Sequence, residues 1–78
     1  MEKFIGKEVK FTVAFGSSLV NTGSISKEFL GTLESFENEY LYFSNIKEKV
    51  YGFTNFTLKD YSNHAVINKQ YLVLLAEI

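Results

Sequence analysis

An alternation of side-chain types near the N-terminus limits how this chain can fold more than any other feature. Every second residue of the segment is large and apolar: Val9, Phe11, Val13 and Phe15. Successive side chains of a β-strand point to opposite faces, so this period of two predicts a strand with one buried face. The same period dominates the rest of the chain, and no proline interrupts it. The sequence therefore predicts an all-β fold.

Glycines and polar segments divide the chain into five expected strands: 9–15, 27–36, 40–45, 50–58 and 65–77. The expected turns and loops are 19–26, 37–39, 47–49 and 59–63. Gly31 and Gly52 mark positions where the sheet is expected to bend. A helix has room only as one turn within residues 1–6 or as a short excursion over 24–30. Five such strands predict one domain over residues 1–78, a small, strongly bent, antiparallel barrel with little or no helix.

The composition excludes several ways in which small proteins are stabilised. The chain has no cysteine and one histidine, so neither a disulfide nor a zinc cluster is expected. Apolar residues make up 46% of the chain, which excludes general disorder and supplies material for a core. A chain of 78 residues builds only a small core, and association between copies is one way to extend it. No metal and no cofactor are expected.

Charge and side-chain chemistry argue against two classes of function. The net charge is −1 and all eight basic residues are lysines, which does not suit a strong, non-specific nucleic-acid binder. Arginine supplies the planar fork that grips phosphates and guanine edges, whereas lysine is a point charge. Asp60 and Ser62 lie close to His64 in sequence, but neighbours along one segment rarely have the geometry of a catalytic triad. We therefore expect no enzymatic activity.

The N-terminus and the apolar runs predict a cytoplasmic protein that does not contact a membrane. Residues 1–7 contain no apolar core of signal-peptide length. The longest apolar run, residues 71–76, is too short to cross a bilayer.

Segments of the chain resemble, in order, the motifs of the Sm/LSm family. Gly31-Thr32-Leu33, Phe36-Glu37 and Tyr40-Leu41-Tyr42-Phe43 resemble the first signature motif. Residues 4–11 resemble the opening strand, and residues 67–74 fall where the second motif is expected. Members of this family are small bent β-barrels of the SH3 type that often form rings and bind RNA. The resemblance implies the same barrel, and with it self-association and an RNA ligand.

The chain departs from the family at positions that contact RNA. Leu41 stands in place of an asparagine whose amide contacts a base, and a leucine cannot hydrogen-bond a base edge. Asn68-Lys69 replaces an Arg-Gly pair, and Glu37 replaces an aspartate. The residues that build the barrel are thus kept, while the groups that read bases are changed.

Aromatic and lysine side chains remain as candidates for ligand contact. Tyr40 occupies the position from which the family stacks a side chain on a base, and Tyr42 shares its face. The same tyrosines would also serve as half-buried packing on a curved sheet. Lysines on expected turns would either surround a pore or pocket or act only as surface residues. The predicted ligand-binding residues are Tyr40, Tyr42, Lys47, Asn68 and Lys69.

The last strand predicts a contact with another copy of the chain. Its apolar residues fall on both faces: Leu72, Val73, Leu74 and Leu75. One face would pack inside the barrel, and the other needs a cover because an exposed apolar edge promotes aggregation. A neighbouring subunit, as in a ring, is one possible cover. The segment 19–30, folded over the strand, is the alternative.

Two functions remain open at this stage. The first is an oligomeric Sm-like module that binds RNA or a nucleotide. The alternative is an oligomeric protein-interaction module, such as an adaptor or a small inhibitor from a mobile element, without nucleic-acid binding. The order of the motifs favours the first function, whereas Leu41, Asn68 and the absence of arginine favour the second.

Overall fold

The chain forms one antiparallel sheet of five strands. This computed structural model describes residues 1–16 and 24–78, with side chains for 1–14 and 26–78. The elements in chain order are η1 (Glu2–Phe4), β1 (Glu8–Gly16), β2 (Ser24–Glu37), β3 (Tyr40–Tyr51), β4 (Phe56–Asn68), η2 (Lys69–Tyr71) and β5 (Leu72–Glu77). The strand order across the sheet is β4-β3-β2-β1-β5. The prediction of an all-β, five-stranded antiparallel fold with almost no helix is confirmed.

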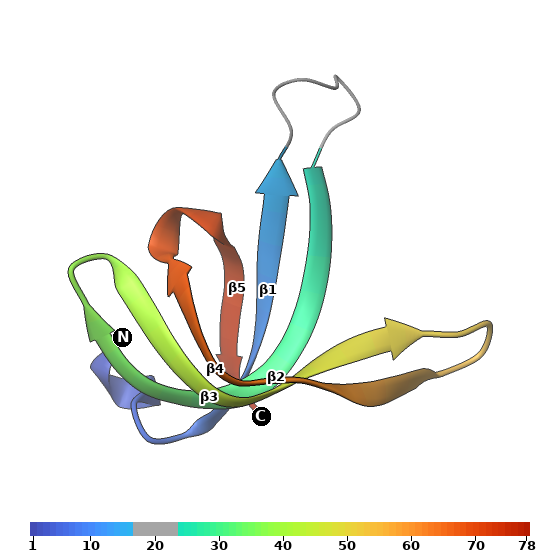
Figure 1. Cartoon of the computed structure of the whole chain (residues 1–78), viewed down its shortest axis with the longest axis horizontal. Coiled ribbons are helices and arrows are strands. Elements are labelled where there is room, and N and C mark those ends of the chain that lie inside the picture. The colour runs from blue at the N-terminus through green and yellow to red at the C-terminus, as the bar shows by residue number, and fades with distance from the viewer. Residues whose placement is uncertain (17–23) are drawn as a thin grey trace.

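The sheet is strongly bent, so that one of its faces becomes concave (Figure 1). β1, β5 and the first half of β2 stand on one side of the bend, and the far ends of β3 and β4 project away from them. Among the described strands, β5 pairs only with β1 and β4 pairs only with β3, so these two strands are the edges of the sheet. Along the chain, the three residues of η2 connect the two edge strands.

The core lies on the concave face and is built by the predicted alternation. Val9, Phe11 and Val13 of β1 are buried, as the period of two indicated. The ring of Phe11 stacks on that of Phe43, with 4.0 Å between ring centroids. The other buried apolar residues come from β2 and β3: Phe29, Leu33, Leu41, Phe43 and Ile46. Leu41 is fully buried, so its side chain packs in the core.

Gly31 bends β2, as its position in the sequence predicted. The pairing of β2 with β3 shifts register between Leu30 and Thr32, which is the signature of a β-bulge. A Cβ atom on Gly31 would lie 3.2 Å from the carbonyl oxygen of Ser44 and 3.5 Å from the ring of Phe11. The glycine thus lets β3 approach β2 closely at the point where the sheet curls.

The turn predicted over 37–39 is also confirmed, and it consists of two residues. Asn38 and Glu39 both have positive φ angles, 50° and 71°. Two left-handed residues between antiparallel strands are typical of hairpin turns whose twist matches that of the strands. Asparagine tolerates this conformation better than most residues do.

The turns predicted over 47–49 and 59–63 were wrong, because both segments lie inside strands. In the pairing of β3 with β4, Lys47 lies opposite Asp60 and Glu48 lies opposite Lys59. Opposite charges on paired residues of neighbouring strands stabilise strand pairing. In the sequence alone, the same run of charged residues indicates a turn exposed to solvent. The true connection lies between Tyr51 and Phe56, so Gly52 belongs to a turn and not to a bend within a strand.

Two further expectations are corrected at the ends of strands. The last strand was predicted to run unbroken over 65–77, but η2 interrupts it. The Asn68 side-chain oxygen accepts a hydrogen bond of 3.1 Å from the backbone N–H of Gln70 and starts the new turn. A helix over 24–30 is excluded because these residues begin β2, whereas the single turn within 1–6 is present as η1. Most of the predicted loop over 19–26 lies outside the described residues.

The outer half of the β3–β4 hairpin, residues 49–58, projects from the body of the fold and is called the arm below (Figure 1). The backbone N–H of Gly52 donates a 2.7 Å hydrogen bond to the carbonyl of Asn55 and closes its tip. The Tyr51 hydroxyl donates a hydrogen bond to the Glu28 carboxylate on β2. This hydrogen bond, helped by partial loss of solvent and by repulsion from the same carboxylate, raises the pKa of the Tyr51 phenol.

Candidate binding site on the concave face

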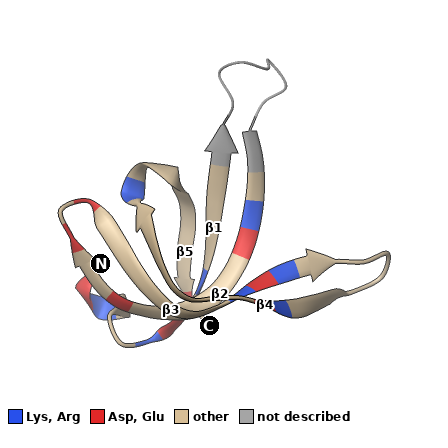
Figure 2. Cartoon of the chain, viewed as in Figure 1, with Lys and Arg blue, Asp and Glu red and all other residues tan. Residues whose placement is uncertain are grey.

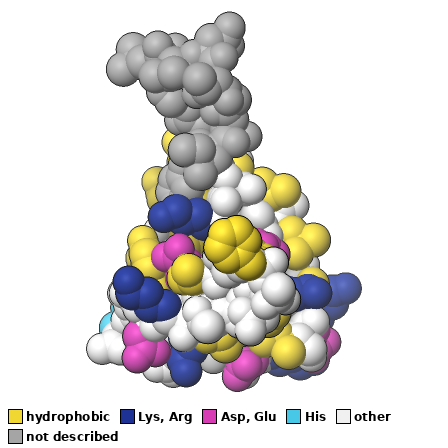
Figure 3. Space-filling model, turned by 90° about the vertical axis from the view of Figure 1, so that its right-hand side faces the viewer, with side chains coloured by type: hydrophobic (Ala, Val, Ile, Leu, Met, Phe, Trp, Pro, Cys, Tyr) yellow, Lys and Arg dark blue, Asp and Glu magenta, His cyan; other side chains and the backbone are white. Residues whose placement is uncertain are grey.

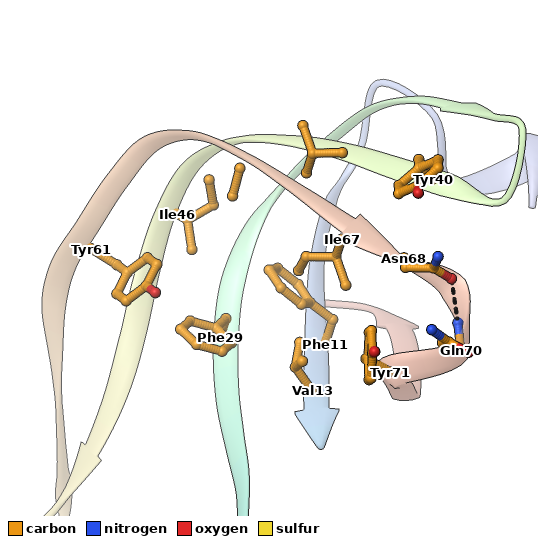
Figure 4. Close-up of a pocket in the computed structure, with 12 residues that line it drawn as sticks. Phe11, Val13, Phe29, Tyr40, Ile46, Tyr61, Ile67, Asn68, Gln70 and Tyr71 are labelled. Carbon is orange, nitrogen blue, oxygen red and sulfur yellow. Dashed lines mark hydrogen bonds between the residues drawn. The ribbon is translucent and has the colours of Figure 1, made fainter. Parts of the chain in front are cut away.

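A hollow of about 610 Å³ opens on the concave face of the sheet. Figure 4 shows it between the inner side of β4 and the core residues of β1 and β2. The residues that line it are Phe11, Val13, Phe29, Tyr40, Ile46, Tyr61, Ala65, Val66, Ile67, Asn68, Gln70 and Tyr71. None of these residues is charged, so the hollow suits a neutral group better than a phosphate or a carboxylate.

Aromatic rings border the hollow on both sides. Tyr61 and Tyr71 lie at opposite sides, with Phe11 between them (Figure 4). The ring of Tyr61 packs edge-on against Phe29, with 5.1 Å between centroids, which fixes its position. Both tyrosines keep about half of their surface exposed. Their ring faces therefore remain available to a flat ligand.

Two amide side chains supply the polar part of the lining. Asn68 ends β4 and lies opposite Tyr40 in the pairing of β3 with β4. Its side-chain oxygen is occupied by the backbone N–H of Gln70, which leaves its NH₂ group as the side that can donate. The backbone N–H of Lys69 donates a 2.8 Å hydrogen bond to the Glu39 carbonyl and ties η2 to the β2–β3 turn. The backbone that carries both amides is thus held in place.

The structure brings together some of the predicted ligand-binding residues and separates the others. Tyr40 and Asn68 line the hollow, and Lys69 follows Asn68 with an exposed side chain. Tyr42 is also exposed but is not part of the lining. Lys47 lies in a second, more polar hollow, where its Nζ atom is 4.0 Å from a carboxylate oxygen of Asp60.

Among the tyrosines and amide side chains of the lining, sequence reasoning missed three: Tyr61, Gln70 and Tyr71. The sequence predicts a loop around Tyr61, whereas the residue lies in β4, so the face of the sheet on which it lies could not be predicted. Gln70 ends the segment Asn68-Lys69-Gln70, a polar interruption between apolar runs, and Tyr71 follows it directly. That interruption was the available signal for a break in the last strand.

The predicted interface residues divide into two pairs. Leu72 and Leu75 are half-buried and pack against the core. Val73 and Leu74 are exposed. A register shift between Thr12 and Val13 in the β1–β5 pairing leaves one extra residue in β5 and turns it outward. Within residues 1–16 and 24–78, β5 is paired along one side only, and its exposed apolar side chains are Val73 and Leu74.

The charged residues of the described chain are dispersed and of mixed sign (Figure 2). Two lysines are near carboxylates: Lys7 Nζ lies 3.2 Å from an oxygen of Glu77, and Lys47 faces Asp60. In residues 1–16 and 24–78, no group of three or more His, Cys, Asp or Glu side chains is placed to hold a metal ion. No helix within these residues has the length and apolar character needed to cross a bilayer.

No protein-family model, curated protein or solved structure matches this chain.

Proposed function

We propose that this chain is a non-enzymatic binding protein of the Sm-like type, which self-associates and holds a base of RNA or of a nucleotide in the hollow. The observation that carries the proposal is the combination of an uncharged apolar floor, tyrosines on both sides and two amides at one end. The order of the sequence motifs supports the same assignment.

A nucleobase matches this lining in shape and polarity. It is flat and neutral, and each base stacked on an aromatic ring contributes about 1–3 kcal/mol regardless of sequence. Amide groups such as those of Asn68 and Gln70 can pair with donors and acceptors on a base edge. Phosphates would stay outside the uncharged lining, where the Lys69 ammonium group is the nearest cation in sequence.

Replacement of Tyr71 by alanine is expected to weaken binding of single-stranded RNA by about 5- to 150-fold, the loss that corresponds to one stacked base. Binding would be measured by fluorescence anisotropy with uridine-rich and adenine-rich oligonucleotides at low salt. Tyr42→Ala is the matched control, because Tyr42 is also an exposed tyrosine but lies outside the hollow.

Two results would contradict the proposal. One is that neither oligonucleotide nor a free nucleotide binds the wild-type protein at low salt. The other is that Tyr42→Ala and Tyr71→Ala reduce binding equally, which would place the ligand elsewhere. The affinity is expected to depend only weakly on salt, since few lysines can contact phosphates.

One observation favours the alternative, an oligomeric protein-interaction module such as an adaptor or a small inhibitor. The lysines of the described chain do not gather into one basic surface but alternate with carboxylates (Figure 2). An uncharged hollow with aromatic walls can also hold an aromatic side chain of a protein partner. Two results together would select this function. The protein would bind no nucleic acid, and substitutions in the hollow would abolish its binding to a protein partner.

Self-association is expected to depend on the exposed side chains of β5. Leu74→Lys would place a charge on an apolar edge, so the mass measured by light scattering is expected to fall. Lys69→Ala is the control, since it changes an exposed charge outside the strand. A wild-type protein that has the mass of a monomer at all concentrations would refute the association.

A further inference from the structure

The arm carries the most exposed apolar surface in the described chain. Phe53 at its tip is 109% exposed, and four other large side chains of the arm are each exposed by 41% or more. These side chains are Val50, Tyr51, Phe56 and Leu58. An isolated two-stranded hairpin is at best marginally stable in water, so a projecting hairpin with this surface is expected to have a cover.

The apolar side chains of the arm are gathered on one face. Tyr51 lies opposite Phe56 and Lys49 opposite Leu58, and residues two apart in a strand share a face. The Tyr51 and Phe56 rings are 6.0 Å apart, and the Lys49 ammonium group lies 4.6 Å from the centre of the Phe56 ring. We call Tyr51, Phe56 and Leu58 the apolar face of the arm. Val50 points to the opposite side, next to Thr57.

Charged groups of both signs border this face in equal number. The lysines are Lys47 and Lys49, and the carboxylates are Asp60, which lies opposite Lys47, and Glu28, which accepts the hydrogen bond from Tyr51. Figure 3 looks onto the arm end and shows hydrophobic, basic and acidic side chains next to one another. RNA or an anionic bilayer would be repelled by this border as much as attracted. A protein surface that also carries both signs of charge can place an opposite charge next to each of these groups.

A second copy of the chain is such a surface. The rings of Tyr51, Phe53 and Phe56 are 61%, 109% and 46% exposed. They could bury roughly 400 Å² per copy, since a whole aromatic side chain buries about 150–250 Å². A standard interface needs about 800 Å² per partner, and Leu58 with the charged border lies next to these rings. Apolar faces that oppose each other around a two-fold axis also bring Lys49 of one copy toward the carboxylates of the other.

We infer that the apolar face of the arm is an interface on which a second copy of this chain docks through the same face, related by a two-fold axis. This contact is separate from the edge of β5, on which the proposed function depends. The two contacts can therefore be removed one at a time.

The decisive variant is Phe56→Ser, and Val50→Ser is its matched control. Phe56 and Val50 are exposed to a similar extent, 46% and 41%, on opposite faces of the same hairpin. In a Leu74→Lys background, light scattering is expected to give a dimer for Val50→Ser and a monomer for Phe56→Ser, a twofold difference in mass. Equal masses for the two variants would overturn the inference. Because Leu74→Lys removes the edge contact, this result does not depend on whether the edges associate.

Hydrogen exchange tests the same contact without a substitution in the arm. In the Leu74→Lys protein, backbone amides over residues 50–58 are expected to exchange several times more slowly at high than at low protein concentration, whereas amides at the β2–β3 turn should not change. Rates over 50–58 that do not depend on concentration would overturn the inference. So would an arm that becomes protected only when phosphatidylserine vesicles or RNA are added.

Discussion

Replacement of Phe43 by alanine is expected to leave most of the protein unfolded at 25 °C. The Phe43 ring is 1% exposed and stacks on Phe11 at the centre of the core. Truncation of a buried phenylalanine costs about 3–5 kcal/mol. That loss is comparable to the whole free energy of unfolding that a single small core can supply, which is rarely above about 3–5 kcal/mol.

Urea denaturation followed by circular dichroism checks this expectation. Phe53→Ala removes the same atoms from a side chain that is fully exposed, so at low protein concentration its unfolding midpoint should stay close to that of the wild type. A Phe43→Ala protein with a nearly unchanged midpoint would mean that the packing of the core differs from the one described.

Gly31→Val is expected to lower the free energy of unfolding by roughly 1–3 kcal/mol or more, as an overpacked core does. A Cβ atom at this position would already lie within 3.2 Å of the Ser44 carbonyl and 3.4 Å of the Ile46 side chain. Valine adds two more carbon atoms in the same space. Either the bulge in β2 must open, or β3 must move away from it.

The matched control for this prediction is Gly52→Ala in the turn of the arm. There the nearest atom to a new Cβ is the Asn55 carbonyl oxygen at 3.4 Å, an ordinary contact. We expect the urea midpoint to fall strongly for Gly31→Val and little for Gly52→Ala. The expectation fails if both proteins unfold at the same urea concentration.

Local sequence patterns were sufficient to predict most of the sheet. The alternation around Phe11 identified β1, Gly31 identified the bulge, and the segment 37–39 identified a turn. These features depend on residues close in sequence. The boundaries of β3 and β4 could not be predicted in this way, because the charges at 47–49 and 59–60 pair across the hairpin. Only the partner strand shows that they belong to a ladder.

The candidate site was predictable only in part for a similar reason. The resemblance to the Sm/LSm motifs predicted Tyr40 and Asn68 as ligand contacts, and both line the hollow. Tyr61 enters it because the sheet bends, and Tyr71 enters it because η2 breaks the last strand. Both events depend on contacts between distant segments, such as the hydrogen bond from Lys69 to Glu39. A pattern within one segment carries no information about them.

The position of η2 has a thermodynamic consequence for any ligand. This short turn provides two of the residues around the hollow, Gln70 and Tyr71, and it also joins the two edge strands of the sheet. A strand added to either edge would therefore act on the same backbone as a group bound in the hollow. If binding and association both shift η2, linkage requires that each changes the equilibrium constant of the other by the same factor. The ligand would then act as an allosteric effector of assembly, and assembly as an effector of ligand binding.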